Sequence, residues 1–219
     1  AYSPETAPAP ARPSGVNLSL AGRTALITGG SRGIGAATVR LFRQAGARVA
    51  FSYRTAQPEA EALAAECGGA PHCIALQQEL ATPEDGQTLI ARALATVGPL
   101  DILVVNHGIW PPYGSVDTIT PARWRNTLAV DLDSAFGLIQ AASAHMLAKP
   151  SPAANAAGPI EAARGHLILV ASAAGQRGDP LHADYSAAKG ALIALTKTLS
   201  AGLAPLGIYA NCVAPGWTS

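Results

Sequence analysis

The sequence predicts an α/β fold built on a single doubly wound parallel sheet with helices on both faces. From Thr24 onward, short runs rich in β-branched residues alternate with longer alanine- and leucine-rich segments at helical spacing, which is typical of repeated βα units. The chain has 219 residues, of which 49% are apolar and 13% charged, so it is long enough for one sizeable core. We therefore expect one domain.

The alternation predicts six strands and five helices. The strands are expected at residues 24–28, 48–53, 72–77, 101–106, 166–172 and 208–213. The helices are expected at residues 33–45, 58–66, 83–97, 121–147 and 183–204. Three of these helices open on proline, which the first turn tolerates because it needs no backbone donor there.

Two segments do not follow the alternation of predicted strands and helices. Residues 1–17 are rich in proline and poor in apolar bulk, which favours a flexible extended tail, and residues 18–219 form the predicted domain. Residues 149–165 are rich in proline, glycine and alanine and interrupt the βα alternation. They are interpreted as a surface insertion without an assigned function.

The charge balance argues against nucleic acid or membrane partners. Fifteen Lys and Arg residues face 14 acidic ones, a net charge of +1, so no basic footprint for nucleic acid or anionic lipid is visible. No apolar run approaches the roughly 18 residues that span a bilayer, and the N-terminus lacks a signal pattern. We expect a cytoplasmic protein whose partner is a small molecule.

The cysteines do not indicate a metal or disulfide site. Cys67, Cys73 and Cys212 form no C-x-x-C motif and cannot all pair with one another. His72 stands beside Cys73, but a fourth ligand at zinc-like spacing is missing. The three are interpreted as ordinary buried thiols, and no metal is expected.

A glycine-rich turn follows the first predicted strand and opens the first helix, with the pattern Gly-x-x-x-Gly-x-Gly at Gly29, Gly33 and Gly35. In this position a Rossmann-type fold presents backbone N–H groups and the positive helix end to a pyrophosphate. The alternative is a tight turn whose glycines serve only the backbone. The predicted cofactor-binding residues of the turn are Gly29, Ser31, Arg32, Gly33, Ile34 and Gly35.

The end of the second strand indicates which dinucleotide binds. An acid there would hold the ribose 2′-hydroxyl of NAD, but the sequence has Tyr53 and Arg54. Arg32 in the glycine turn can converge with Arg54 on a 2′-phosphate. The cofactor is therefore predicted to be NADP(H); the alternative for each arginine is a solvated surface charge.

Tyr185 and Lys189 stand four residues apart on one predicted helix, so the phenol and the amine share a face. An adjacent ammonium favours the phenolate, and we expect it to lower the pKa of Tyr185 toward a usable acid and base. Ser172 ends the fifth predicted strand, 13 residues before Tyr185, where its hydroxyl can hold a substrate oxygen. The alternative is an exposed helix pair without a special role.

The glycine turn, the strand-end serine and Tyr-x-x-x-Lys together resemble the short-chain dehydrogenase/reductase family from Thr24 to about Gly216. The resemblance implies that Tyr185 exchanges the substrate proton, that Lys189 binds the nicotinamide ribose and that Ser172 orients the carbonyl, while hydride passes directly between cofactor and carbon. It also implies a homodimer or homotetramer and places further matching residues around the cofactor. These are Asp101, Asn106, Gly108, Pro215 and Gly216.

The sequence departs from the family at several points. Asp131 stands where the family has its fourth catalytic residue, an asparagine, and its charge near Lys189 would raise the pKa of the lysine. His107 replaces an alanine after the fourth strand and is interpreted as locally hydrogen-bonded rather than catalytic. The chain ends at Ser219, so the usual substrate-covering segment and last strand are expected to be absent from it.

The predicted function is an NADP(H)-dependent oxidoreductase acting on a carbonyl or secondary alcohol, resembling 3-oxoacyl-carrier-protein reductases among other members. The alternative is an NADP(H)-binding sensor or scaffold with lost or reduced turnover, which Asp131 and the missing lid would favour. Residues 110–113, Trp-Pro-Pro-Tyr, can wall an apolar substrate pocket or simply pack as a rigid aromatic loop.

Overall fold

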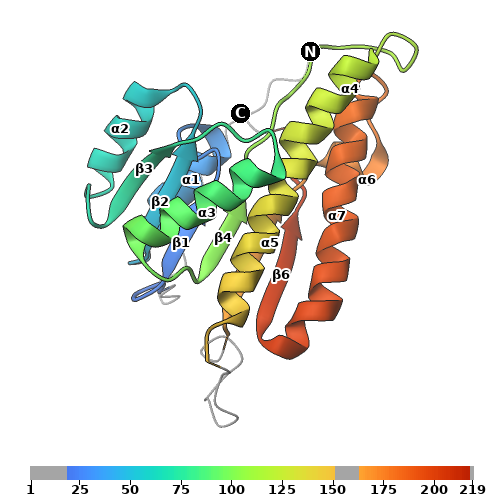
Figure 1. Cartoon of the computed structure of the whole chain (residues 1–219). Coiled ribbons are helices and arrows are strands. Elements are labelled where there is room, and N and C mark those ends of the chain that lie inside the picture. Colours follow the sequence, from blue (N-terminus) through green and yellow to red (C-terminus); the bar gives the residue numbers. More distant parts are fainter. Residues whose placement is uncertain (1–18, 151–162, 218–219) are drawn as a thin grey trace, which may run out of the picture.

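A computed structural model describes residues 19–150 and 163–217 of the chain. Its centre is one six-stranded parallel sheet with the strand order β3-β2-β1-β4-β5-β6 (Figure 1). The strands are β1 (Thr24–Ile27), β2 (Arg48–Tyr53), β3 (Cys73–Gln77), β4 (Ile102–Val105), β5 (Gly165–Val170) and β6 (Ile208–Val213). This confirms the predicted fold class, because the order is that of a doubly wound dinucleotide-binding sheet.

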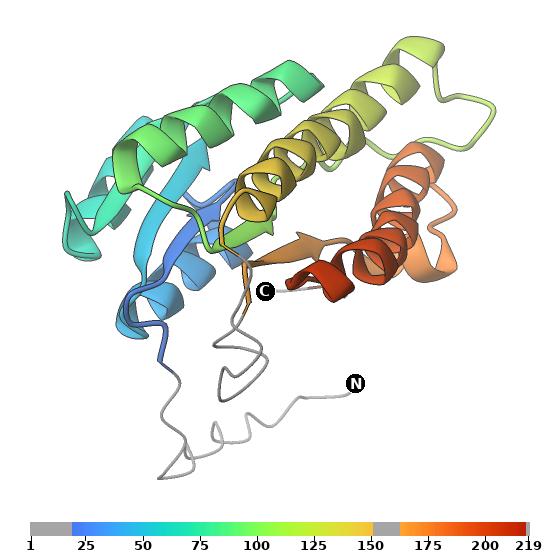
Figure 2. The ribbon, with the colours of Figure 1, turned by 60° about the horizontal axis from the view of Figure 1, so that its bottom comes forward.

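Helices cover both faces of the sheet (Figures 1 and 2). Residues of α3 (Pro83–Val97), α5 (Ser134–Leu147) and α7 (Ala183–Leu203) share one buried cluster with one set of alternating strand side chains. Residues of α1 (Gly33–Gln44) and α2 (Gln57–Glu66) share a second cluster with the other set. Because side chains alternate along a strand, the two clusters are separated by the sheet itself.

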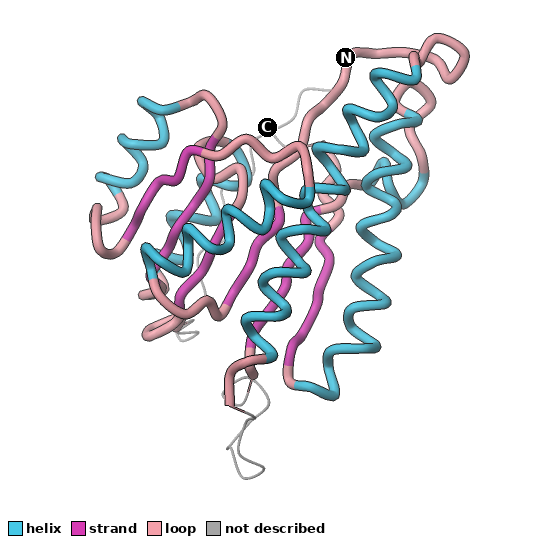
Figure 3. Tube along the Cα trace, in the orientation of Figure 1, coloured by secondary structure: helices cyan, strands magenta, loops and turns pink. Residues whose placement is uncertain are grey.

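The long helix expected over residues 121–147 contains a local irregularity. It consists of α4 (Pro121–Leu128), a π-helical segment (Ala129–Asp133) and α5, which run on from one another (Figure 3). The backbone N–H of Ser134 bonds to the carbonyl of Ala129, one residue further back than in an α-helix. Such π segments often lie at functional sites, and this one contains Asp131.

The fifth strand is shorter than predicted. It ends at Val170, and Ser172 instead caps a short helix, α6 (Ala173–Arg177), with its hydroxyl accepting from the N–H of Ala174 at 3.1 Å. The correction keeps Ser172 at the carboxyl end of the sheet, because α6 follows β5 directly. The other predicted elements agree with the structure to within two residues at each end, apart from the unpredicted 3₁₀ turn at Ala204–Leu206.

Other expectations are corrected or untested. Asp101 lies at the amino end of β4, where it accepts from the N–H of Thr24 at 2.9 Å and from Lys149 Nζ at 2.8 Å, so it is not around the predicted cofactor site.

The three cysteines were expected to be buried thiols. Cys73 is buried, but Cys67 and Cys212 are only half-buried. The whole predicted tail, residues 1–17, lies outside the described residues, as does most of the predicted insertion. Within the described part, no helix is long and apolar enough to cross a membrane.

Candidate functional site

The glycine turn between β1 and α1 is shaped for close backbone approach. Gly29 and Gly33 have φ angles of +63° and +53°, which favour glycine. A Cβ on Gly30 would lie 2.5 Å from Phe51, and one on Gly35 would collide with the carbonyl oxygen of Gly29. No side chain caps the start of α1, so its first-turn N–H groups are left for another acceptor.

Asn106, directly after β4, ties the glycine turn to the centre of the sheet. Its side-chain amide donates to the carbonyl oxygens of Thr28 at 3.0 Å and Gly29 at 3.1 Å. The Thr28 hydroxyl in turn accepts from the backbone N–H of Asn106 at 2.9 Å. The ends of β1 and β4, between which the strand order reverses, are therefore held in one arrangement, as expected for a ligand site at the switch point.

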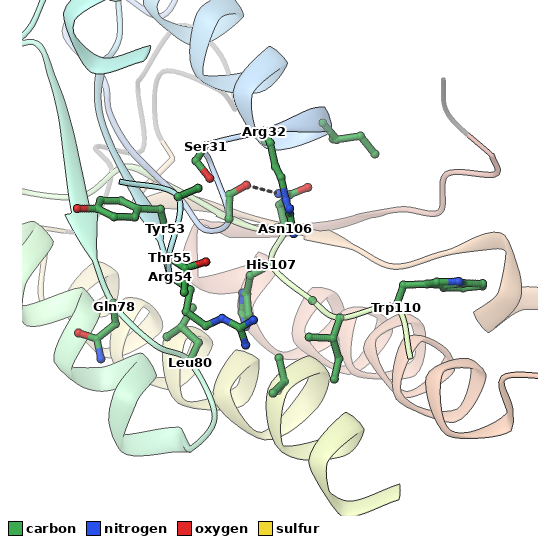
Figure 4. A pocket seen from close by; sticks show the side chains of 17 residues that line it. Ser31, Arg32, Tyr53, Arg54, Thr55, Gln78, Leu80, Asn106, His107 and Trp110 are labelled. Atoms are coloured by element: carbon green, nitrogen blue, oxygen red, sulfur yellow. Dashed lines mark hydrogen bonds between the residues drawn. The ribbon is translucent and has the colours of Figure 1, made fainter. Parts of the chain in front are cut away.

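A cavity of about 610 Å³ opens above this turn. Arg32 and Arg54 both line it, and Figure 4 shows their side chains reaching into it from the glycine turn and from the end of β2. No acidic residue lines it. The predicted cofactor-binding residues that it brings together are Gly29, Ser31, Arg32, Ile34, Gly35, Tyr53, Arg54, Asn106 and Gly108.

A second cavity of about 250 Å³ continues from the first and shares part of its wall, including Asn106 and Gly108. Ser172, Tyr185 and Lys189 all line it. Lys189 Nζ lies 5.6 Å from the centre of the Tyr185 ring. The predicted residues Pro215 and Gly216 lie in the same wall. Gly33 lines neither cavity.

Asp131 lies beneath the floor of the second cavity. It is 1% exposed, and its Oδ2 lies 3.9 Å from Lys189 Nζ. Its Oδ1 accepts from the backbone N–H of Ile109 at 2.8 Å, which fixes the loop after β4. A Cβ on Gly108 would lie 3.1 Å from Lys189 Nζ and 3.2 Å from both carboxylate oxygens of Asp131, so a side chain there would make this pair shift by a few tenths of an ångström.

The electrostatics of this group follow from burial. Burial raises the pKa of Asp131 to about 6, although the charge of Lys189 opposes the rise. Burial lowers the pKa of Lys189, and Asp131 partly counteracts this, as the sequence predicted for its charge. The net direction for the lysine is nevertheless downward, because desolvation outweighs one neighbouring carboxylate.

The pKa of Tyr185 differs from the expectation. Burial raises it above its ordinary value, the Ser172 hydroxyl partly offsets the rise, and Asp131 adds to it. The expected lowering by Lys189 is not among the causes that act on the pKa of Tyr185. The reason is that half-burying a phenol disfavours its charged form more than this distant ammonium favours it.

His107 is a local structural residue, as predicted. One ring nitrogen, Nδ1, lies 2.8 Å from the Thr28 hydroxyl and the other, Nε2, lies 2.8 Å from the Ser134 hydroxyl. Burial and the charge of Lys189 lower its pKa to about 3, so the ring stays neutral. The imidazole bridges the end of β1 to α5, and His107 also lines the first cavity.

Trp110 forms the wall where these cavities meet a third one, of about 320 Å³, that Ser172 and Tyr185 also line. Its ring packs edge-on against Tyr185, with the ring centroids 4.8 Å apart. The two interpretations of the aromatic loop therefore both apply to this residue, because it packs on neighbouring rings and faces a cavity.

Sequence reasoning missed part of the site. Thr55, Gln78 and Leu80 also line the first cavity. Their signal was their place just after β2 and β3, at the carboxyl edge of the sheet. His182 and Asp179, which lie beside Trp110 and Tyr185 in space, carried no recognisable spacing signal. Among the described residues, no group of His, Cys, Asp or Glu side chains is arranged to hold a metal.

The first two cavities fit a dinucleotide. The turn leaves helix N–H groups uncapped beside glycines that have no side chains to block a ligand, and two guanidinium groups face the same space. The narrower second cavity places the phenol, the hydroxyl and the ammonium at the far end of this space. Phosphate groups would lie against the turn and the nicotinamide ring near Tyr185.

The chain matches the family described as short chain dehydrogenase over residues 23–219. It is 32% identical to mouse L-fucose dehydrogenase over 90% of this chain and 66% of the relative. It is 33% identical to a 3-oxoacyl-[acyl-carrier-protein] reductase from Synechocystis over 91% of this chain and 75% of the relative. The chain thus spans about two thirds to three quarters of these relatives.

A solved short chain dehydrogenase from Burkholderia cenocepacia, in complex with NADP, superimposes with a TM-score of 0.79. The two chains are 34% identical, and the match covers 93% of this chain and 77% of the other. The sequence match, the strand order of the sheet and the arrangement of the cavity side chains all indicate the same family. The chain therefore belongs to the short-chain dehydrogenase family of oxidoreductases, as the resemblance of its motifs predicted.

Proposed function

We propose that the protein is an NADP(H)-dependent oxidoreductase that interconverts a carbonyl compound and a secondary alcohol. The observation that carries the proposal is that Ser172, Tyr185 and Lys189 line one cavity that is continuous with the space above the glycine turn. A bound nicotinamide there supplies or accepts the hydride. The side chains of this protein supply the proton and the orientation.

In the direction of reduction, the Tyr185 hydroxyl donates its proton to the carbonyl oxygen as the carbon is reduced, and Ser172 donates a hydrogen bond to the same oxygen. In the direction of oxidation, the tyrosine oxygen accepts that proton. A tyrosine that donates a proton must be protonated before the transfer, so the raised pKa of Tyr185 is compatible with the reductive role.

Lys189 and Asp131 assist the proton exchange at Tyr185 through their positions and charges. Lys189 Nζ donates to the carbonyl oxygen of Val170 at 3.3 Å and lies 3.9 Å from Asp131, so it is held at the cavity floor. Its remaining N–H groups are free to bind a ribose. Asp131 replaces the family asparagine by fixing the backbone at Ile109 and by opposing the fall in the pKa of Lys189 that burial causes.

The preference for NADP(H) rests on Arg32 and Arg54. Both line the first cavity, and its lining carries no carboxylate that would repel a 2′-phosphate. The complex of the Burkholderia relative with NADP supports the same assignment. The relatives named for sugars and for acyl-carrier-protein thioesters define the first substrates to assay, and a homodimer or homotetramer is the proposed assembly.

The experiment is a steady-state screen of carbonyl substrates with NADPH and with NADH. We expect turnover with NADPH, a lower kcat/KM with NADH, and a reversal of that ratio toward NADH in Arg54→Asp. Arg125→Asp, which changes the same charge on α4 away from the cavity lining, is the control. Equal or better use of NADH by the unaltered protein would refute the cofactor assignment.

Asp131 also favours a second function, an NADP(H)-binding sensor with reduced turnover, because a buried carboxylate here replaces the family amide. The two functions separate in one measurement. Turnover that Tyr185→Phe abolishes supports the enzyme. NADPH binding without turnover across sugars, ketones, aldehydes and acyl thioesters supports the sensor.

A further inference from the structure

Trp110 occupies the junction of all three cavities. It lines the space above the glycine turn, the cavity with Lys189, and the third cavity, in which Ser172 and Tyr185 face the same space. Its side chain is 46% exposed, so a large part of the indole surface is open to a bound molecule. Of the described residues, Ile34, Asn106, Gly108 and Ile109 share only the first two of these cavities.

A buried imidazole holds the indole in place from behind. The rings of Trp110 and His182 lie 3.9 Å apart between centroids at an interplanar angle of 35°. His182 is 0% exposed, and its Nδ1 lies 2.8 Å from Asp179 Oδ1. Because the imidazole is buried and paired with Asp179, its contact limits the positions that the indole can take.

The backbone reinforces the same contact. The N–H of Gly114 donates to the carbonyl oxygen of Leu181 at 3.0 Å, and Gly114 forms a parallel bridge with His182. The Tyr113 ring also lies 5.0 Å from the ring of His182. The loop after β4 and the loop before α7 therefore form one unit, which places Trp110 next to Tyr185.

A second indole, that of Trp217, lies at a steep angle to the ring of Trp110. Trp217 lies 5.7 Å from Trp110 at an interplanar angle of 71° and is 84% exposed. The two rings and the small residues Ala173, Ala174 and Gly178 line the third cavity, and Arg177 and Asp179 stand in the same lining. Next to the two hydroxyl groups, this cavity offers two aromatic surfaces at a steep angle.

We propose that Trp110 selects substrates that carry an alicyclic or aromatic ring directly on the reacting carbon, and that His182, fixed by Asp179, positions it. This inference rests on the proposed function and names the substrate class of that site. A ring of fixed shape packs on an indole face with less conformational freedom to lose on binding than a mobile chain of the same carbon number. Its attached oxygen then reaches the hydroxyl groups of Ser172 and Tyr185.

The test compares cyclohexyl methyl ketone with octan-2-one, two methyl ketones of equal carbon number. We expect the unaltered protein to favour the ring compound in kcat/KM by about tenfold, which corresponds to roughly 55 Å² of additional apolar contact with the indole. Trp110→Ala should bring the ratio close to unity, mainly through KM for the ring compound. Trp110→Phe, which keeps an aromatic face, should retain most of the preference.

His182 is tested as a positioning residue. His182→Ala removes the stack and should lower the ring preference through KM. His182→Phe keeps an aromatic ring and removes the buried Nε2, which has no partner within the described residues, so it should fold and restore the preference. Trp124→Ala is the matched control, because Trp124 on α4 is partly exposed and lines none of these cavities. A purely structural role would change the melting temperature and leave the ratio unchanged.

Failure of the inference is distinct from failure of the proposed function. If both ketones are reduced and the ratio is the same in Trp110→Ala as in the unaltered protein, the ring preference is wrong and the oxidoreductase stands. If neither ketone is reduced, calorimetric titration of both compounds into the NADP⁺-loaded protein tests the preference without turnover. Tighter binding of the ring compound that Trp110→Ala abolishes supports it, and equal or undetectable binding of both compounds overturns it.

Discussion

Replacing Asp131 with asparagine removes a buried ionisable group while keeping the size of the side chain. In the folded protein the pKa of Asp131 is raised from its ordinary 3.8 to about 6 by burial. The folded state therefore binds more protons than the unfolded state between these two values. Because of this, the carboxyl makes the fold less stable as the pH rises through that window.

The magnitude follows from the same two values. A difference of one in pKa corresponds to about 1.4 kcal/mol, so the change from 3.8 to about 6 is worth about 3 kcal/mol. The asparagine side chain does not ionise, so it adds nothing to the pH dependence of the free energy of unfolding. The free energy of unfolding of Asp131→Asn minus that of the unaltered protein should therefore increase by about 3 kcal/mol from about pH 3 to about pH 8.

Urea denaturation at a series of pH values measures this difference. His107, whose lowered pKa makes the fold less stable on acidification, is present in both proteins and drops out of the comparison. Asp133→Asn is the control, because Asp133 is exposed two residues away on the same helix, and its curve should run parallel to that of the unaltered protein. A difference for Asp131→Asn that is flat with pH would refute the buried, proton-binding carboxyl.

Three further predictions concern the same site and its supports. Asp131 raises the pKa of both Tyr185 and Lys189. Asp131→Asn should therefore keep turnover and move the alkaline limb of the pH–rate profile for reduction to lower pH. Superimposable pH–rate profiles of the two proteins would contradict this. Gly35→Ala should weaken NADPH binding in fluorescence titration by about tenfold or more, because the new methyl meets the carbonyl of Gly29, and unchanged affinity would exclude the close approach. Arg123→Ala removes the guanidinium that lies 2.9 Å from the fully buried carboxylate of Asp184, so the free energy of unfolding measured in urea should fall by about 3–5 kcal/mol. A fall below about 1 kcal/mol, which is typical of exposed pairs, would show that the pair is solvated.

The fold could be predicted from the sequence because its signals are local. Each βα unit repeats the same change of hydrophobic period, and the glycine turn stands where a strand gives way to a helix. The π segment at Ala129–Asp133 could not be predicted, since its residues suit an ordinary helix equally well. The strand end before Ser172 was misplaced because a serine cap and a strand-end serine look alike in sequence.

The candidate site was predictable where its residues follow strands. Arg54, Asn106 and Ser172 all come just after a strand, and parallel strands bring their carboxyl ends to one edge. Asp101 shows the limit of this reasoning, because it begins a strand and lies at the opposite edge. The pairing of Trp110 with His182 joins residues far apart in the chain, so only the folded structure reveals it.

The raised pKa of Tyr185 was also beyond sequence reasoning. A Tyr-x-x-x-Lys spacing indicates proximity along a helix, but the balance of burial and charge depends on what surrounds both groups. The same applies to Asp131, whose protonation is set by the depth of its burial beneath Gly108.

The central claim is direct hydride transfer with Tyr185 exchanging the proton. The most direct test incubates the protein with NADPH that is deuterated at both C4 positions of the nicotinamide, together with a reducible carbonyl substrate, and determines the deuterium content of the product by mass spectrometry. We expect one deuterium on the carbinol carbon with the unaltered protein and none with Tyr185→Phe, while both proteins bind NADPH. A product without deuterium, or equal labelling by Tyr185→Phe, would contradict the account.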